Sequence, residues 1–287
     1  MTHLSDYSFL QRIIGLSYVF IWLVYRIQTT GGFGCLQFSK FKQGDLKSFV
    51  TAWLLIMLPF QLYYDIMSCK IKYQEGYAVL VGHIQTKPEI LWTQADRDLV
   101  LPTDYSLCVG FSLQIGTLLL LQCFWKYLAK LVAKARFMSS KEFKFYIIMT
   151  MINIILFPVI QYTFSQPGLY DVTFKEIIPQ LVYGIELWCI SLLGGVSHVR
   201  FKTLLKGPFV TDKIKYFQEL NLLLSIALFI FSTSFIILSG DGLTTAKKIN
   251  TNKFASDLMI CNINMMCILI WVLVILIIHP NKIYNRR

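Results

Sequence analysis

Five polar side chains lie inside otherwise apolar stretches, where their residue types are unusual. They are the acids Asp65 and Glu186 and the amides Gln114, Gln161 and Asn262. In lipid, such groups are costly, and they usually face the interior of a helix bundle or a water-filled cavity. We therefore predict that these five residues contact a small ligand. The alternative is that they form hydrogen bonds between neighbouring helices.

Glu186 is the acid that the sequence places deepest in an apolar stretch. A carboxyl group at that depth needs a cation, a hydrogen-bond donor or a proton. Its functional interpretation is contact with a ligand or an ion, or a proton-sensitive switch. Its structural interpretation is a carboxyl group bonded to a neighbouring helix.

The sequence lacks the motifs of the common catalytic and metal sites. The histidines are His3, His83, His198 and His279, which form no HExxH or HxxxH pair. There is no GxSxG motif, no phosphate-binding glycine loop, and no CxxC among the seven cysteines. We therefore expect a protein that is not an enzyme and that has no cofactor or metal ion.

Seven apolar stretches are the elements that must position these side chains. A membrane-spanning helix needs about 20 mainly apolar residues. The windows that supply them are 9–27, 48–67, 105–125, 145–164, 178–199, 220–239 and 258–278. They predict an all-α polytopic membrane protein, with residues 1–287 forming one seven-helix transmembrane domain. The first window also resembles a signal-peptide core, but its bulky Tyr18, Trp22 and Tyr25 favour a retained anchor.

The composition agrees with a lipid bilayer as the surrounding medium. Of the 287 residues, 55% are hydrophobic and 15% are charged, whereas about 25% are charged in ordinary soluble domains. The net charge of +11 comes from basic residues between apolar spans, so we expect no nucleic-acid partner.

The distribution of the basic residues predicts the orientation. The first, third and fifth loops and the C-terminal tail hold 18 of the 27 Lys and Arg residues. The positive-inside rule therefore puts the N-terminus outside and the C-terminus in the cytoplasm. Which membrane this is, plasma membrane or endomembrane, stays open. We expect five of the basic residues to contact lipid headgroups or a cytoplasmic partner: Lys126, Lys130, Arg200, Lys202 and Lys206.

A long outer loop, residues 68–104, joins the second and third windows. An ordinary surface loop is the favoured interpretation, and a hairpin or lid is the alternative. Cys69 and Cys108 lie at the outer ends of these two windows. They form a disulfide only if their Cα atoms come within about 7 Å, and two free thiols are the other interpretation.

Several exits from the spans suggest a family. The third span leaves through the basic stretch 124–130, the fifth through 198–201 and the seventh through 279–282. With seven spans and an outside N-terminus, this pattern resembles the seven-transmembrane half of the receptor-like regulators of G-protein signalling of plants and fungi. The resemblance implies a receptor-like fold and contact with a heterotrimeric G protein. Only nine residues follow Ile278, so we do not expect the family's GTPase-accelerating domain.

Three classes of function follow from these observations. Seven spans, the predicted orientation and the basic cytoplasmic loops favour a receptor-like signalling protein. Glu186 and Asp65 within the spans favour a small-solute or proton-coupled transporter as the alternative. A non-catalytic membrane organiser or trafficking protein is the third.

Overall fold

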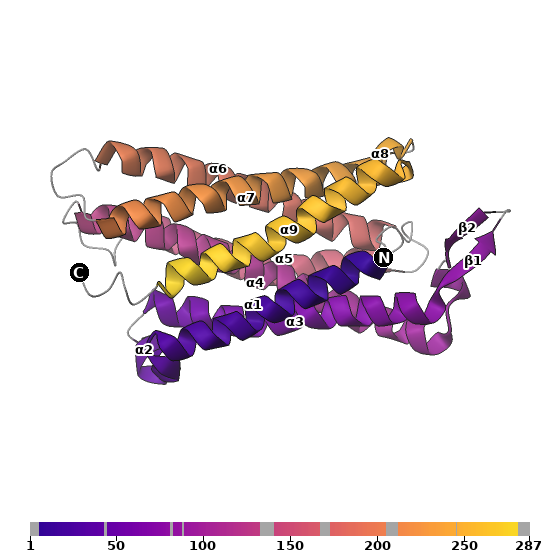
Figure 1. The fold of residues 1–287 in the computed structure, drawn as a ribbon, viewed down its shortest axis with the longest axis horizontal. Helices are drawn as coiled ribbons and strands as arrows, with labels where there is room; N and C mark the ends of the chain where they lie inside the picture. The colour runs from indigo at the N-terminus through magenta and orange to yellow at the C-terminus, as the bar shows by residue number, and fades with distance from the viewer. Residues whose placement is uncertain are drawn as a thin grey trace.

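The fold is taken from a computed structural model, which describes residues 6–42, 45–80, 83–87, 89–132, 141–166, 173–204, 212–244 and 246–280. Within these ranges, seven helices are long and apolar enough to cross a membrane. They are α1 (Asp6–Thr29), α3 (Leu46–Glu75), α4 (Gln94–Val132), α5 (Lys141–Phe164), α6 (Phe174–Leu204), α7 (Asp212–Leu243) and α9 (Lys253–Ile278). The predicted multi-pass helical bundle is confirmed (Figure 1).

Short elements mark the two ends of the bundle (Figure 1). Strands β1 (Tyr77–Leu80) and β2 (His83–Thr86) form an antiparallel hairpin, with Tyr77 opposite Thr86 and Leu80 opposite His83. We call this side of the molecule the hairpin end; it also holds η2 (Glu89–Leu91), α8 (Lys248–Thr251) and the start of α1. The opposite end, which we call the α2 end, holds η1 (Gly32–Leu36), α2 (Phe38–Lys42) and the end of α9.

Local sequence explains several helix boundaries. Asp45 begins α3, where its carboxylate accepts hydrogen bonds from Lys47 N at 3.3 Å and Ser48 Oγ at 2.9 Å. Gly76 ends the same helix with φ of 63°, a left-handed conformation that glycine adopts without a steric penalty. Asn252 caps the start of α9 by accepting from Ala255 N at 3.2 Å.

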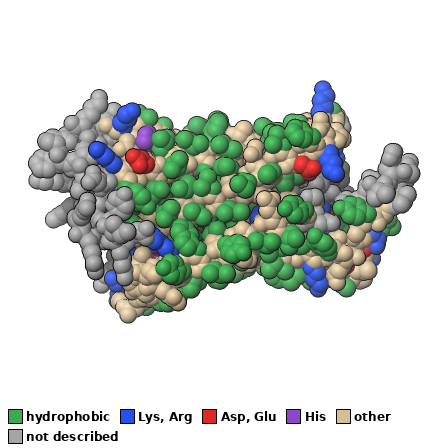
Figure 2. Space-filling view, viewed as in Figure 1, with side chains coloured by type: hydrophobic (Ala, Val, Ile, Leu, Met, Phe, Trp, Pro, Cys, Tyr) green, Lys and Arg blue, Asp and Glu red, His purple; other side chains and the backbone are tan. Residues whose placement is uncertain are grey.

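Helix α4 is the central helix of the bundle. It packs against α3, α5 and α6, and 89% of its most apolar window is buried, a larger share than in any of the other six spans. The surrounding helices expose large apolar side chains such as Ile21, Ile155 and Leu223. These side chains form a hydrophobic surface between the charged ends (Figure 2), as contact with lipid requires.

Helices α6 and α7 approach each other closely at Gly194. A Cβ atom at this position would lie 2.3 Å from Ser225 Oγ, so a larger residue would require Ser225 to move. Asn221 on α7 donates its side-chain amide to the Gly194 carbonyl at 3.2 Å. A small residue combined with an interhelical hydrogen bond is a common way to join helices in membranes.

The region 68–104 differs from the ordinary surface loop that the sequence favoured. Helix α3 continues to Glu75 and α4 begins at Gln94, so the connection contains only residues 76–93 and includes the hairpin. The helices extend beyond their apolar windows because their amphipathic ends bury a second small core. This core contains Phe9, Tyr64, Cys69, Ile71, Trp92 and Val100.

Candidate functional site

An ion pair between α1 and α3 lies within the hairpin half of the bundle. Arg12 Nε donates to Asp65 Oδ1 at 2.8 Å, and Arg12 Nη2 donates to the same oxygen. The Asp65 side chain is fully buried and that of Arg12 is 11% exposed. The guanidinium also lies 5.4 Å from the ring centre of Phe9 and 5.8 Å from that of Tyr64, which are favourable cation–π distances. Each charge therefore has a partner in a site with little water.

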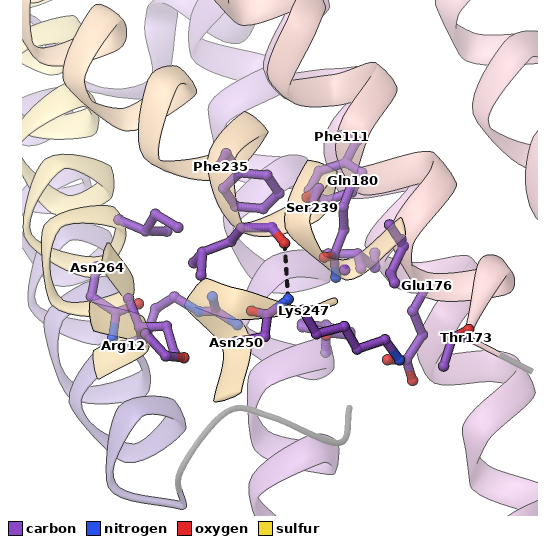
Figure 3. A pocket seen from close by; sticks show the side chains of 18 residues that line it. Arg12, Phe111, Thr173, Glu176, Gln180, Phe235, Ser239, Lys247, Asn250 and Asn264 are labelled. Atoms are coloured by element: carbon purple, nitrogen blue, oxygen red, sulfur yellow. Dashed lines mark hydrogen bonds between the residues drawn. The ribbon is translucent and has the colours of Figure 1, made fainter. Parts of the chain in front are cut away.

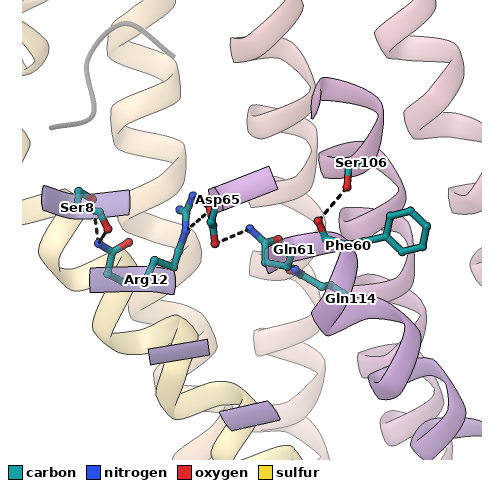
Figure 4. Close-up of polar contacts among 8 residues, drawn as sticks. Ser8, Arg12, Phe60, Gln61, Asp65, Ser106 and Gln114 are labelled. Atoms are coloured by element: carbon teal, nitrogen blue, oxygen red, sulfur yellow. Dashed lines mark hydrogen bonds and ion pairs between the residues drawn. The ribbon is translucent and has the colours of Figure 1, made fainter. Parts of the chain in front are cut away.

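The ion pair begins a chain of buried polar side chains that crosses four helices, and Figure 4 shows its members on α1, α3 and α4. Gln61 Nε2 donates to Asp65 Oδ2 at 3.5 Å, and Gln114 Nε2 on α4 donates to Gln61 Oε1 at 2.9 Å. Tyr183 on α6 completes the chain by donating its hydroxyl hydrogen to Gln114 Oε1. We call Arg12, Asp65, Gln61, Gln114 and Tyr183 the polar chain. A connected network of this kind fixes the relative positions of helices because each unpaired member would be costly in lipid.

A cavity of about 140 Å³ lies beside the polar chain (Figure 3). Side chains from α1, α3, α4, α6, α7 and α9 contribute to its wall. Arg12 belongs both to the wall and to the polar chain. The other polar wall residues include Thr173, Glu176, Gln180, Ser239, Lys247, Asn250, Ser256 and Asn264. The cavity therefore combines polar groups with an apolar core surface.

Aromatic side chains join the cavity wall to the polar chain. Phe111 and Phe235 line the cavity. Phe111 stacks on Tyr183 with ring centres 4.0 Å apart and an interplanar angle of 12°, and Phe235 meets Phe111 edge to face at 6.4 Å. Such contacts stabilise the packed aromatic cluster. A molecule that moves Phe111 must also move Tyr183, which holds Gln114.

The segment between α7 and α9 positions another charged wall residue. Asp241 Oδ2 accepts from Ile249 N at 3.0 Å and from Asn250 N at 2.8 Å, which orders the start of α8. Lys247 precedes α8 with φ of 41°, a conformation that is uncommon for a residue other than glycine. Its side chain and that of Glu176 point toward one another at one side of the cavity (Figure 3).

The structure brings together two of the five predicted ligand-binding residues. Asp65 and Gln114 both belong to the polar chain, where Gln61 joins them. Neither lines the cavity itself. Asn262 is half-buried and outside the cavity wall, whereas Asn264, two residues later, is buried and within it.

Gln161 belongs to a separate cluster between α4 and α5. Its Nε2 atom donates to Asp104 Oδ2 at 3.5 Å and to Ser165 Oγ at 3.1 Å. Its Oε1 atom accepts a hydrogen bond from Cys108 Sγ at 3.5 Å. Neither Cys69 nor Cys108 forms a disulfide, so the disulfide interpretation is wrong in this structure.

Glu186 lies apart from the cavity, against Asn153 on α5. The Asn153 side chain is close enough to the Glu186 carboxyl group to affect it electrostatically. Glu186 Oε2 and Asn153 Oδ1 are buried without a hydrogen-bond partner in the structure. This pair offers two acceptor atoms to a proton or to a donor group.

Sequence reasoning missed Arg12, Gln61 and Tyr183 as parts of the candidate site. Arg12 carried a partial signal, because it lies within the first apolar window, 9–27, where a buried arginine needs an acidic partner. Among the acids, Asp65 lies within the apolar window 48–67 of another span. Gln61 precedes Asp65 by one helical turn, which is the spacing at which side chains meet.

At the α2 end, His279 joins three helices. Its Nδ1 atom lies 2.7 Å from Thr30 Oγ1, and its Nε2 atom lies 3.0 Å from Thr51 Oγ1. Arg26 Nη2 donates to the His279 carbonyl. Burial, with the nearby charges of Lys47 and Arg26, lowers the pKa of His279 to about 4. The imidazole is therefore neutral at pH 7 and links the ends of α1, α3 and α9.

The predicted partner-binding residues follow α4 and α6 toward the α2 end. Lys202 is exposed in the last turn of α6. Lys126 and Lys130 belong to the last turns of α4, and Arg200 belongs to α6. Lys206 lies outside the described residues.

Comparisons of the chain with protein-family models, with curated proteins and with solved structures find no match. The resemblance to the receptor-like regulators of G-protein signalling therefore stays a prediction.

Proposed function

We propose that the protein is a receptor-like membrane protein that binds a small molecule in the cavity at the hairpin end. In this proposal, binding changes the packing of α4, α6 and α7, and a heterotrimeric G protein contacts the basic α2 end. The observation that carries the proposal is the position of the cavity, which lies beside a polar chain that crosses four helices. The cavity and the chain share Arg12 and are joined by the Phe111–Tyr183 stack.

The packing of the other half of the bundle favours a receptor over an open pathway. Leu23, Ile27, Val50, Leu54 and Val274 are all fully buried toward the α2 end. A close-packed apolar region excludes water and ions. A bound molecule would therefore change the relative positions of the helices instead of passing through the bundle. In a receptor, such a change couples the ligand site to a distant surface.

The predicted orientation agrees with this arrangement. The positive-inside rule places the hairpin end outside and the α2 end in the cytoplasm. Cysteines engineered near residues 5 and 285 test the orientation by labelling with a membrane-impermeant reagent. We expect labelling of the first site from outside and of the second only after permeabilisation. Labelling of both sites from one side would contradict the seven-span topology.

A binding experiment tests the signalling function. The full chain in nanodiscs is mixed with a heterotrimeric G protein, with and without a non-hydrolysable GTP analogue. We expect a complex that the analogue dissociates, because receptors bind the nucleotide-free or GDP-bound form best. Lys202→Glu should weaken this complex, since it reverses an exposed charge at the α2 end. Lys253→Glu, at the hairpin end, is the matched control and should leave it unchanged.

A proton-coupled transporter is the second candidate, and the unpartnered Oε2 atom of Glu186 favours it. Counterflow of labelled solutes into proteoliposomes between pH 5 and 8 tests this function. In a transporter, Glu186→Gln abolishes the pH dependence of uptake per inserted molecule, because the amide cannot carry the coupling proton. Identical pH profiles for the two proteins would eliminate this role.

A further inference from the structure

The charges on the cavity wall are already balanced. Arg12 is paired with Asp65 at 2.8 Å, and the side chains of Lys247 and Glu176 point toward one another (Figure 3). A charged ligand would have to draw Arg12 away from Asp65, or Lys247 away from Glu176, or else remain without a counter-charge. Separating the Arg12–Asp65 pair would be especially costly, because the Asp65 side chain is fully buried. The wall therefore favours a ligand without net charge.

One polar residue of the wall has a side-chain atom without a partner. Asn264 is 1% exposed and donates its Nδ2 hydrogens to the carbonyl and hydroxyl oxygens of Ser8, at 3.2 and 2.9 Å. Its Oδ1 atom is buried and has no hydrogen-bond partner in the structure. A carbonyl oxygen accepts hydrogen bonds only, so the group that satisfies it must be a donor. Among small neutral donors, a hydroxyl group is the simplest.

The size and the apolar surface of the cavity limit the rest of the ligand. Its volume is about 140 Å³, and an apolar cavity of about 150 Å³ holds a benzene-sized molecule. Phe111, Phe235, Ile260 and Ile263 contribute apolar wall surface. The two phenylalanine rings meet edge to face, and a ring placed beside them extends the same kind of packing.

We propose that the cavity binds a small uncharged molecule that has an apolar ring and a hydroxyl group, with the hydroxyl group donating to Asn264 Oδ1. The proposal rests on the proposed function to the extent that the same cavity is the ligand site. It adds the chemical class of the ligand, which the proposed function leaves open.

Four probes of similar size test the class: benzyl alcohol, toluene, benzylammonium and benzoate. Their affinities are measured at pH 7.4 by ligand-observed NMR titration of the protein in nanodiscs, and binding to empty nanodiscs is subtracted. We expect benzyl alcohol to bind about three- to tenfold more tightly than toluene, which is the range for one net hydrogen bond. The two ions should bind at least about tenfold more weakly than benzyl alcohol.

Two pairs of variants locate the binding. Asn264→Leu should remove the preference for benzyl alcohol over toluene, while the control Asn262→Leu, on the same helix but outside the wall, should retain it. Ser239→Phe places a ring in the cavity and should abolish binding of every probe. Its control is Gly240→Phe, because Gly240 is absent from the wall and a Cβ there would meet no atom within 4 Å. The Ser239 pair keeps the test decisive if Asn264→Leu fails to fold.

The outcomes separate this inference from the proposed function. Preference for benzylammonium or benzoate would overturn the neutral class while leaving the cavity as a ligand site. Binding that Ser239→Phe leaves unchanged would overturn the cavity as the site. Benzyl alcohol binding that follows the expected variant pattern, without any nucleotide-sensitive G-protein complex, would support this inference and refute the proposed function.

Discussion

The ion pair between Arg12 and Asp65 gives a prediction whose size follows from its geometry. Arg12→Met removes the positive charge and leaves the fully buried Asp65 with one long hydrogen bond, from Gln61 at 3.5 Å. An N–O distance of 2.8 Å corresponds to charge centres about 4 Å apart, where attraction is about 4 kcal/mol at an effective dielectric constant of about 20. Breaking a buried pair on one side costs about 3–5 kcal/mol in measured cases. We expect Arg12→Met to lower the free energy of unfolding by this amount.

The double variant Arg12→Met/Asp65→Leu should recover most of the loss. It removes both charges, so neither is left buried without a counter-charge, and apolar replacements of similar volume are often neutral or stabilising. The two substitutions are therefore strongly non-additive, with a coupling energy of about 3 kcal/mol. Lys175→Met is the control, because it breaks the more exposed pair with Glu89 at 2.8 Å and should cost less than about 1 kcal/mol.

Reversible unfolding by SDS in mixed micelles, followed by far-ultraviolet circular dichroism, measures these differences in one assay. Equal effects of Arg12→Met and Lys175→Met would refute the reasoning. So would a double variant whose loss equals the sum of the two single losses, since that result would mean that the charges do not interact.

Three further predictions concern packing, pH and the thiols. In the SDS titration, Gly194→Val should destabilise the bundle by about 1–3 kcal/mol, because its Cβ would lie 2.3 Å from Ser225 Oγ on α7. Gly195→Val is the control and should be near neutral, because a Cβ at Gly195 meets no atom within 4 Å. The pKa of His279 is about 4 in the folded protein against an ordinary value of 6.5, so the unfolded chain binds the proton first as the pH falls. The contribution of His279 to the free energy of unfolding is constant above pH 6.5 and decreases by up to about 3 kcal/mol between pH 6.5 and 4. His279→Gln should remove this decrease from the plot of unfolding free energy against pH. An unchanged plot would contradict the low pKa of His279. Cys69 and Cys108 should both be alkylated after denaturation without reductant, as mass spectrometry will show. A protected pair would contradict the structure, in which neither cysteine forms a disulfide.

The number and approximate positions of the helices could be predicted because lipid imposes a simple rule on sequence. A span needs about 20 apolar residues, and each of the seven windows coincides with a long helix. The helix ends could not be predicted in this way. Lys72 and Asp96 lie outside the apolar windows, yet α3 and α4 continue through both positions. Their helices extend because Ile71 and Val100 bury a second core outside the apolar windows.

The candidate site could be predicted only in part, because hydrophobicity shows which residues are unusual and not which ones meet. Asp65 and Gln114 were identified individually, yet Gln61 joins them and Arg12 neutralises one of them. An arginine near the end of an apolar window also has the character of an interfacial anchor, so the sequence alone does not assign it to the core. The sequence does not assign Tyr183 to the polar chain either, because its apolar ring is typical of a core residue and only its hydroxyl group joins the polar chain.

The cavity and the polar chain lie in the hairpin half of the bundle, so a signal from a bound molecule would have to pass through the α2 half. In the hairpin half, the cavity, the polar chain and the aromatic cluster share residues, so the packing there depends on hydrogen bonds with few alternatives. In the α2 half, apolar side chains such as Leu23 and Val50 are fully buried. A close-packed core has low compressibility, so a shift of one helix there would shift the helices packed against it. A molecule that fills the cavity acts on Phe111 and, through the Tyr183 stack, on the relative position of α4 and α6. Because Gly194 holds α6 tightly against α7, these two helices would move together, and the exposed Lys202 at the end of α6 would move with them.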